Sequence, residues 1–159
     1  MISNKFWKRP SALLASLFVM AGVAQTPPAL SVSDPAKLTI ARNATADYKL
    51  HLQVREGFHV NSNKPNDEYL IPIQVTWGEG PLEVGEVEYP KPKLEKYDFS
   101  PNPLSIYDGS FDVTTKFKVK TSAAPGLGLQ PVKVRYQACT DKMCYPPKTI
   151  EVKVPVLVQ

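Results

Sequence analysis

Apolar and polar side chains alternate without a break in residues 48–54: Tyr48-Lys49-Leu50-His51-Leu52-Gln53-Val54. In an extended strand, successive side chains point to opposite faces, so a period of two puts all the apolar groups on one face. One face of this segment is therefore expected to be buried and the other to meet water. The stretch predicts a β-strand that covers a hydrophobic core.

The same period recurs along the chain. It covers residues 111–119, 132–136 and 150–158, and residues 71–77 add a strand that starts beside Pro72, where a missing N–H is tolerated. Turn-forming residues separate these segments, and no stretch shows a convincing helical period of 3.6. About eight short strands joined by turns predict an all-β fold, a two-sheet antiparallel sandwich in a single domain.

Two segments do not fit simple strands. One is residues 57–65, Gly-Phe-His-Val-Asn-Ser-Asn-Lys-Pro, and the other is the long connection from Tyr89 to Tyr107, which contains four prolines. A connection of this length within a compact domain is either functional or mobile. These two segments are therefore candidates for the functional part of the molecule.

Most of the net positive charge lies at the start of the chain. The 159 residues include 19 Lys plus Arg and 15 Asp plus Glu, and Lys5, Lys8 and Arg9 precede every acidic residue. Without these three, 16 basic residues face 15 acidic ones, so no basic patch remains to bind nucleic acid. With 8 Gly and no Gly-rich phosphate loop, the sequence also argues against a nucleotide-binding enzyme.

A short apolar run follows the three basic residues. It spans residues 12–23, about 12 residues, which is too short to cross a bilayer comfortably, and it ends in small residues up to Ala24. The pattern predicts a secretory signal peptide over residues 1–24; the alternative is an uncleaved inner-membrane anchor. In either case the rest lies outside the cytoplasm, as a Pro-rich extended leader at residues 25–34 and one domain at residues 35–159.

The two cysteines, Cys139 and Cys144, enclose only four residues. A disulfide between them would close one local hairpin and would not join two sheets, and a loop of about 6 residues stabilises by roughly 2 kcal/mol in the chain-entropy model. Reduction should therefore leave the fold standing, which a working redox pair requires. Two alternatives remain open: a fixed hairpin disulfide in an oxidising compartment, and a metal site completed by His51 or His59, although the spacing matches no common zinc pattern.

The cysteine segment resembles the N-terminal domain of the thiol:disulfide interchange protein DsbD. The resemblance is carried first by Tyr-Gln-Ala-Cys at residues 136–139 and Cys-Tyr-Pro-Pro at residues 144–147. Residues 57–65, Tyr-Leu-Ile-Pro at 69–72 and Pro-Leu-Ser-Ile-Tyr-Asp-Gly at 103–109 also look like stand-alone relatives of that domain. Together these motifs extend the resemblance over residues 35–158.

The resemblance implies a fold, a place and a reaction. The fold is an immunoglobulin-like sandwich in the periplasm, whose cysteine pair passes electrons onward by thiol–disulfide interchange. Cys144 would form the mixed disulfide with a partner and Cys139 would resolve it. The donor would be a separate thioredoxin-like protein or membrane electron transporter, and the acceptor a periplasmic disulfide isomerase or cytochrome c maturation protein.

The resemblance also implies a cap loop with an aromatic residue over the cysteine pair. Residues expected in or beside this cap are Tyr97, Asp98, Phe99, His59, Asn61 and Tyr136. We expect no cofactor, no metal and a monomer. We also expect thiol pKa values near or above the usual value of about 8.5, because a hairpin offers no helix dipole and Asp141 opposes the nearby cation Lys142. The competing hypothesis is a secreted binding or structural module whose disulfide never opens.

Overall fold

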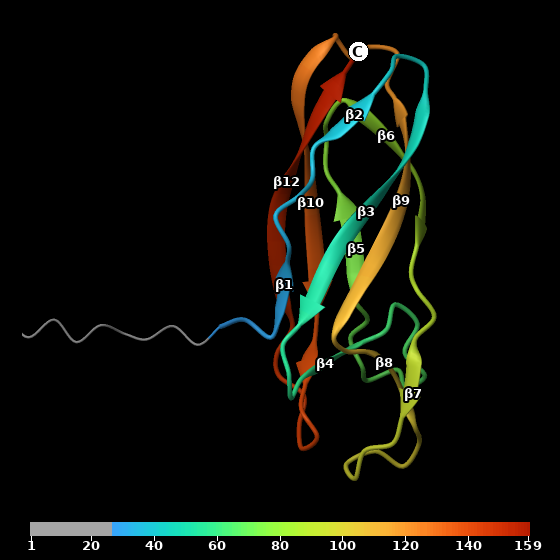
Figure 1. Cartoon of the computed structure of the whole chain (residues 1–159). Coiled ribbons are helices and arrows are strands. Elements are labelled where there is room, and N and C mark those ends of the chain that lie inside the picture. The colour runs from blue at the N-terminus through green and yellow to red at the C-terminus, as the bar shows by residue number, and fades with distance from the viewer. Residues whose placement is uncertain (1–26) are drawn as a thin grey trace, which may run out of the picture.

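The computed structural model describes residues 27–159, and Figure 1 shows them as strands joined by loops. The predicted signal peptide, residues 1–24, lies outside the described residues. Within residues 27–159, no helix is long and apolar enough to span a membrane.

The first sheet contains the stretch with the clearest alternation. Its strand order is β1 (Leu30–Val32), β3 (Thr45–Val54), β9 (Ser110–Val119) and β6 (Leu82–Glu88). β3 and β9 pair in antiparallel fashion from Thr45↔Lys118 to Gln53↔Ser110. The four apolar side chains of residues 48–54 are buried and the three polar ones are exposed, as the period of two predicts.

The second sheet is built around the two longest strands. Its order is β2 (Leu38–Ile40), β12 (Lys148–Val158), β10 (Gly126–Tyr136) and β5 (Gln74–Trp77). β10 and β12 are each 11 residues long and pair over their whole length. β2 pairs with β12 in parallel, which departs from the purely antiparallel arrangement that was predicted.

One hydrophobic core fills the space between these sheets. An aromatic cluster lies at its centre, where the Trp77 ring meets Phe117 edge-on at 4.7 Å and Tyr48 at 6.0 Å between ring centroids. Phe117 is fully buried and Trp77 partly buried, with the indole Nε1 donating a 3.0 Å hydrogen bond to Thr115 Oγ1. A fully buried side chain of this size contributes about 1.5–3 kcal/mol to folding, so this cluster is a major part of the core.

A third, smaller sheet lies at one end of the sandwich. Its order is β11 (Ala138–Cys139), β4 (His59–Asn61), β8 (Leu104–Tyr107) and β7 (Lys93–Glu95). Figure 1 places β4, β7 and β8 together at the end opposite the C-terminus. The two segments that did not fit simple strands supply β4, β7 and β8, so the described chain has twelve strands in three sheets and not about eight in two.

The sandwich begins earlier than residue 35. Leu30 is fully buried and pairs with Val54, and β1 forms the edge of the first sheet within the segment expected to be an extended leader. The structure thus moves the start of the sheet to Leu30. The overall architecture is an all-β, immunoglobulin-like sandwich with a small sheet added at one end.

Candidate functional site

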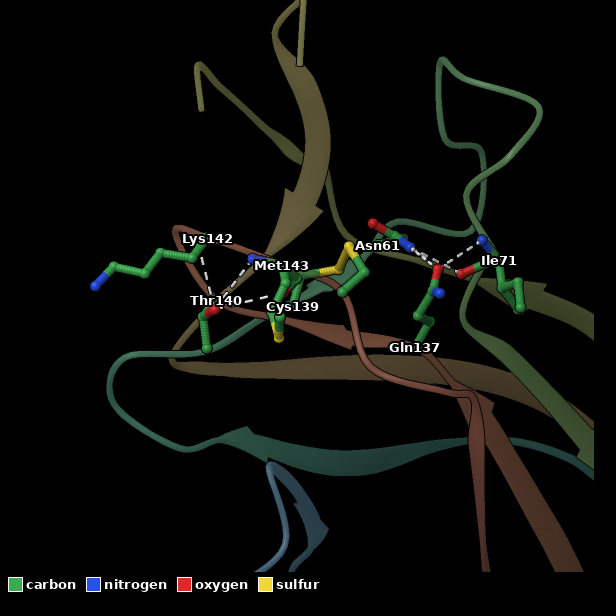
Figure 2. The surroundings of a disulfide bond; sticks show 8 residues. Asn61, Ile71, Gln137, Cys139, Thr140, Lys142 and Met143 are labelled. Atoms are coloured by element: carbon green, nitrogen blue, oxygen red, sulfur yellow. Dashed lines mark hydrogen bonds between the residues drawn. A yellow bond between two sulfur atoms is a disulfide. The ribbon is translucent and has the colours of Figure 1, made fainter. Parts of the chain in front are cut away.

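The cysteines lie in a tight hairpin, residues 138–145, which we call the Cys hairpin. It follows the end of β10 and precedes β12, whose ladder closes at Tyr136↔Lys148. Thr140 N donates to Met143 O at 2.8 Å, and Tyr145 N donates to Ala138 O at 2.8 Å. A disulfide joins Cys139 to Cys144 across this turn, and their Cα atoms are 3.9 Å apart. Figure 2 shows the surroundings of this bond, with Cys139 labelled. The bond is local, as the sequence predicted.

The two bonded cysteines differ in exposure. Cys139 is 0% exposed, whereas Cys144 is partly exposed. Interchange begins when a thiolate attacks one sulfur of a disulfide and expels the other. Of the two bonded cysteines, Cys144 is therefore the more accessible to a molecule that approaches from solvent.

One face of the small sheet carries the polar groups beside the disulfide. His59 lies directly opposite Cys139 in the β4–β11 ladder, and Asn61 follows two positions later on the same face. The Asn61 amide Nδ2 donates to Ile71 O at 3.1 Å and to Gln137 Oε1 at 2.9 Å. Ile71 N donates to the same Gln137 oxygen at 3.0 Å, so one glutamine side chain ties β4 and the following loop to the Cys hairpin (Figure 2).

His59 is buried in an acidic environment. Burial lowers the pKa of the imidazole from its usual value, and the negative charges of Glu95 and Asp108 oppose part of that shift. Asp108 also forms an ion pair with Lys93. His59 Nε2 has no hydrogen-bond partner among residues 27–159, and the same holds for Asn61 Oδ1.

Residues 96–100, which we call the cap segment, fold over this face. The Tyr97 ring stacks on His59 with centroids 4.4 Å apart, and Phe99 stacks on Tyr97 at 5.5 Å. A turn holds the segment, with Ser100 N donating to Tyr97 O at 3.1 Å and Lys96 Nζ donating to Ser100 O. Burial, reinforced by Glu95, raises the pKa of the Tyr97 hydroxyl.

The structure brings most of the expected neighbours together. Tyr97, His59 and Cys139 form a continuous series, while Phe99 and Asp98 are exposed on the outer side of the cap segment. Tyr136 is buried in the main core at the end of β10, and burial raises its pKa. Asn61 is part of strand β4.

Sequence reasoning did not single out Gln137 or Glu95. Gln137 lies two positions before Cys139. Residues two apart in a strand share a face, so this spacing could have indicated that the Gln137 side chain lies on the same face as Cys139. The structure also places the charge of Asp108 near His59. Within residues 27–159, no three His, Cys, Asp or Glu side chains gather as a metal-ion site.

An apolar groove of about 380 Å³ lies beside the Cys hairpin. Tyr145 and the two following prolines line it, and the Phe58 ring approaches Tyr145 at 6.0 Å. The Arg55 guanidinium lies 4.4 Å from the Phe58 ring centroid. The residue after Cys144 therefore borders a concave apolar surface.

Comparisons with solved structures identify similar folds. The N-terminal periplasmic domain of ScsB from Proteus mirabilis is 12% identical, with a TM-score of 0.51 over 79% of this chain and 44% of that one. The DsbD N-terminal domain of Neisseria meningitidis in its reduced form is 17% identical, with a TM-score of 0.43 over 71% of this chain and 79% of that one. This chain thus covers less than half of the ScsB structure, and that likeness shows the fold alone. No curated protein matches the sequence significantly.

A family model gives the decisive match. The model described as "Thiol:disulfide interchange protein DsbD, N-terminal" matches residues 26–155, which is most of the chain. The match spans both segments that form the small sheet and the whole Cys hairpin. This match and the Cys139–Cys144 disulfide together support thiol–disulfide interchange as the chemistry of the site. The chain therefore belongs to the family of DsbD N-terminal domains.

Proposed function

We propose that this chain passes electrons between two protein partners, with Cys144 as the interchanging sulfur and Cys139 as the resolving one. The observation that carries the assignment is the difference in exposure, since Cys139 is fully buried and Cys144 is partly exposed. The cap segment supports it, because Tyr97 and Phe99 extend from His59, the cross-strand neighbour of Cys139. Tyr97, Asp98 and Phe99 thus form the proposed cap.

The reaction proceeds in two exchanges. A donor thiolate forms a bond to Cys144 Sγ, the Cys139–Cys144 bond breaks, and the electron pair moves to Cys139 Sγ. The donor's second thiol then attacks the mixed disulfide, so the donor leaves as a disulfide and both cysteines of this chain are thiols. In the second exchange the Cys144 thiolate attacks an acceptor disulfide and forms a mixed disulfide with it. The Cys139 thiol then attacks Cys144, the Cys139–Cys144 disulfide forms again, and the acceptor leaves as a dithiol with two more electrons and two more protons.

The proposed setting is the periplasm. Residues 1–24 would act as a cleaved signal peptide, or as an inner-membrane anchor if uncleaved, ahead of a domain whose first strand begins at Leu30. The donor would be a thioredoxin-like protein or a membrane electron transporter. The acceptor would be a periplasmic disulfide isomerase or a cytochrome c maturation protein. The working form would be a monomer without a bound cofactor.

Trapping tests the roles of the two sulfurs. The Cys139→Ala variant keeps a free Cys144 thiol and should accumulate mixed disulfides with a thioredoxin-like protein, because the resolving thiol is missing. The Cys144→Ala variant, which keeps only the buried sulfur, is the matched control and should trap far less. Equal trapping by both variants would contradict the assignment.

The reduction potential tests the competing hypothesis of a fixed disulfide. Structural disulfides have potentials below about −300 mV, and those that take part in exchange lie higher. Equilibration of the wild-type chain with glutathione, followed by quantitative thiol alkylation, measures this value. A potential below that limit would favour the binding or structural module.

A further inference from the structure

Two buried atoms beside the disulfide lack hydrogen-bond partners in the oxidised protein. We propose that His59 is a positioning residue that hydrogen-bonds the Cys139 sulfur when the pair is reduced, with Asn61 Oδ1 as a second acceptor. This inference rests on the proposed function and deepens it. It assigns a residue that favours the reduced state of the buried cysteine.

Strand register places both residues beside the buried sulfur. His59 is directly opposite Cys139 in an antiparallel ladder, where side chains of opposed residues lie on one face with Cβ atoms about 4.5–5.5 Å apart. Asn61 lies on the same face, as its hydrogen bond to Gln137 confirms. Figure 2 shows the Asn61 amide beside the disulfide, with its oxygen turned away from Gln137 and Ile71.

The orphaned atoms are unusual because buried polar atoms are nearly always paired. His59 Nε2 and Asn61 Oδ1 are the unpartnered buried side-chain atoms of residues 27–159, and both belong to the three-residue strand β4. An unpaired buried polar group destabilises the state that contains it. The oxidised protein therefore carries two unsatisfied groups next to its redox centre.

Reduction supplies the missing partner. A disulfide has no hydrogen to donate, whereas each thiol formed by two electrons and two protons carries one S–H group. With the ring proton on Nδ1, His59 Nε2 accepts from the Cys139 S–H group. With the proton on Nε2, it donates to the Cys139 thiolate that forms when a donor attacks Cys144. The first tautomer thus stabilises the fully reduced pair and the second stabilises the thiolate of the mixed-disulfide intermediate, and burial keeps the ring neutral.

The cap segment holds the imidazole in position. Tyr97 stacks on the His59 ring at 4.4 Å, and the carboxylates of Glu95 and Asp108 lie near enough to influence its charge. The ring plane is therefore fixed by stacking while its Nε2 edge remains free. This arrangement prepares the nitrogen for a partner that appears only after reduction.

The His59→Phe variant separates hydrogen bonding from packing, because a phenyl ring can keep the stack on Tyr97. In equilibrium with a glutathione redox buffer, we expect its disulfide to be about tenfold harder to reduce than in the wild type, a fall of about 30 mV for a two-electron couple. The matched control is His51→Phe, which alters the exposed histidine paired with Asp112 and should leave the equilibrium unchanged. An unchanged equilibrium in His59→Phe would overturn the proposal.

A measurement on the unaltered protein covers the case in which His59→Phe does not fold. Nitrogen-15 NMR of the imidazole should show a change at His59 Nε2 on reduction that is absent at His51. An Nε2 signal that is identical in the oxidised and reduced proteins would also overturn the proposal. Failure of the proposed function would be seen in a separate experiment, in which the Cys139→Ala variant traps no thioredoxin-like protein.

Discussion

The Tyr97 ring stacks on the His59 imidazole at 4.4 Å, and this contact links the cap segment to the strand beside Cys139. The cap segment itself contains no strand, and its backbone hydrogen bond from Ser100 to Tyr97 is local. Side-chain contacts, namely the stack on His59 and the interaction with Glu95, therefore attach Tyr97 to the small sheet. Such an attachment can open without breaking any strand pairing, which a partner that approaches Cys144 would require.

Removal of the cap aromatics should expose the disulfide. A stacked aromatic pair contributes about 1 kcal/mol, so Tyr97→Ala/Phe99→Ala should raise the rate of reduction by glutathione roughly five- to tenfold. The measurement is the pseudo-first-order rate of thiol release under excess glutathione. Leu127→Ala/Leu129→Ala, a double change of exposed residues at the far end of β10, is the control. If the cap variant reacts no faster than this control, residues 97–99 do not shield the pair.

Acid should destabilise the oxidised protein through His59. Its pKa is lowered in the folded state, so the unfolded chain binds more protons below the unperturbed value of 6.5. The contribution to stability is complete above that pH and is lost as the pH falls through 6.5 toward the folded value. The carboxylates of Glu95 and Asp108, with Lys93 paired to the latter, offset part of the effect and do not reverse its sign.

Denaturant titrations between pH 5 and 8 measure this dependence. His59→Phe should flatten the fall in the free energy of unfolding below pH 6.5, whereas His51→Phe should not. A His59→Phe profile that is parallel to the wild type would show that His59 is not desolvated as the structure indicates.

Gln137 should be important for the stability of the site. Its Oε1 accepts hydrogen bonds from Asn61 Nδ2 and Ile71 N, and both donors would lose this partner in Gln137→Ala. We expect a loss of about 1–3 kcal/mol in the free energy of unfolding, measured in urea. Gln137→Glu keeps an acceptor oxygen at the same reach and should retain most of the stability at neutral pH. Equal losses in the two variants would mean that the hydrogen bonds are not the reason.

Reduction of the disulfide should cost about 2 kcal/mol or less, because the closed loop is short. Thermal melts followed by circular dichroism, with and without reductant, should both show a cooperative transition well above room temperature. Cys139→Ser/Cys144→Ser should melt with the reduced protein and be insensitive to reductant. Global unfolding of the reduced form at room temperature would favour a structural role for the bond.

The long strands could be predicted because each residue alternates against the same core. β3 and β9 are each 10 residues long, so the alternation of apolar and polar residues can be recognised even where one residue departs from it. β4, β7 and β8 have only 3 or 4 residues each, and a strand of that length shows no period. The small sheet was therefore predicted only as two irregular segments.

Only the part of the site that is local in sequence could be predicted from the residues alone. Cys139 and Cys144 are neighbours in sequence, and the family resemblance pointed to His59, Asn61 and the cap. The pairing of His59 with Cys139 depends on a ladder between residues 80 positions apart, which no local pattern encodes. The stacking of Tyr97 on His59 depends likewise on how a loop is placed against a strand that is distant in sequence.

The paired strands β10 and β12 have a kinetic consequence for the two thiols. After reduction, Cys139 and Cys144 stay attached to the ends of an 11-residue ladder and remain within one short hairpin. Groups held on so short a tether meet at an effective concentration of millimolar or more, whatever the abundance of the protein. If Cys144 captures partners as proposed, their release would be a unimolecular event whose rate does not fall on dilution. The rate of electron transfer would then depend on how often partners bind, and each mixed disulfide would be short-lived.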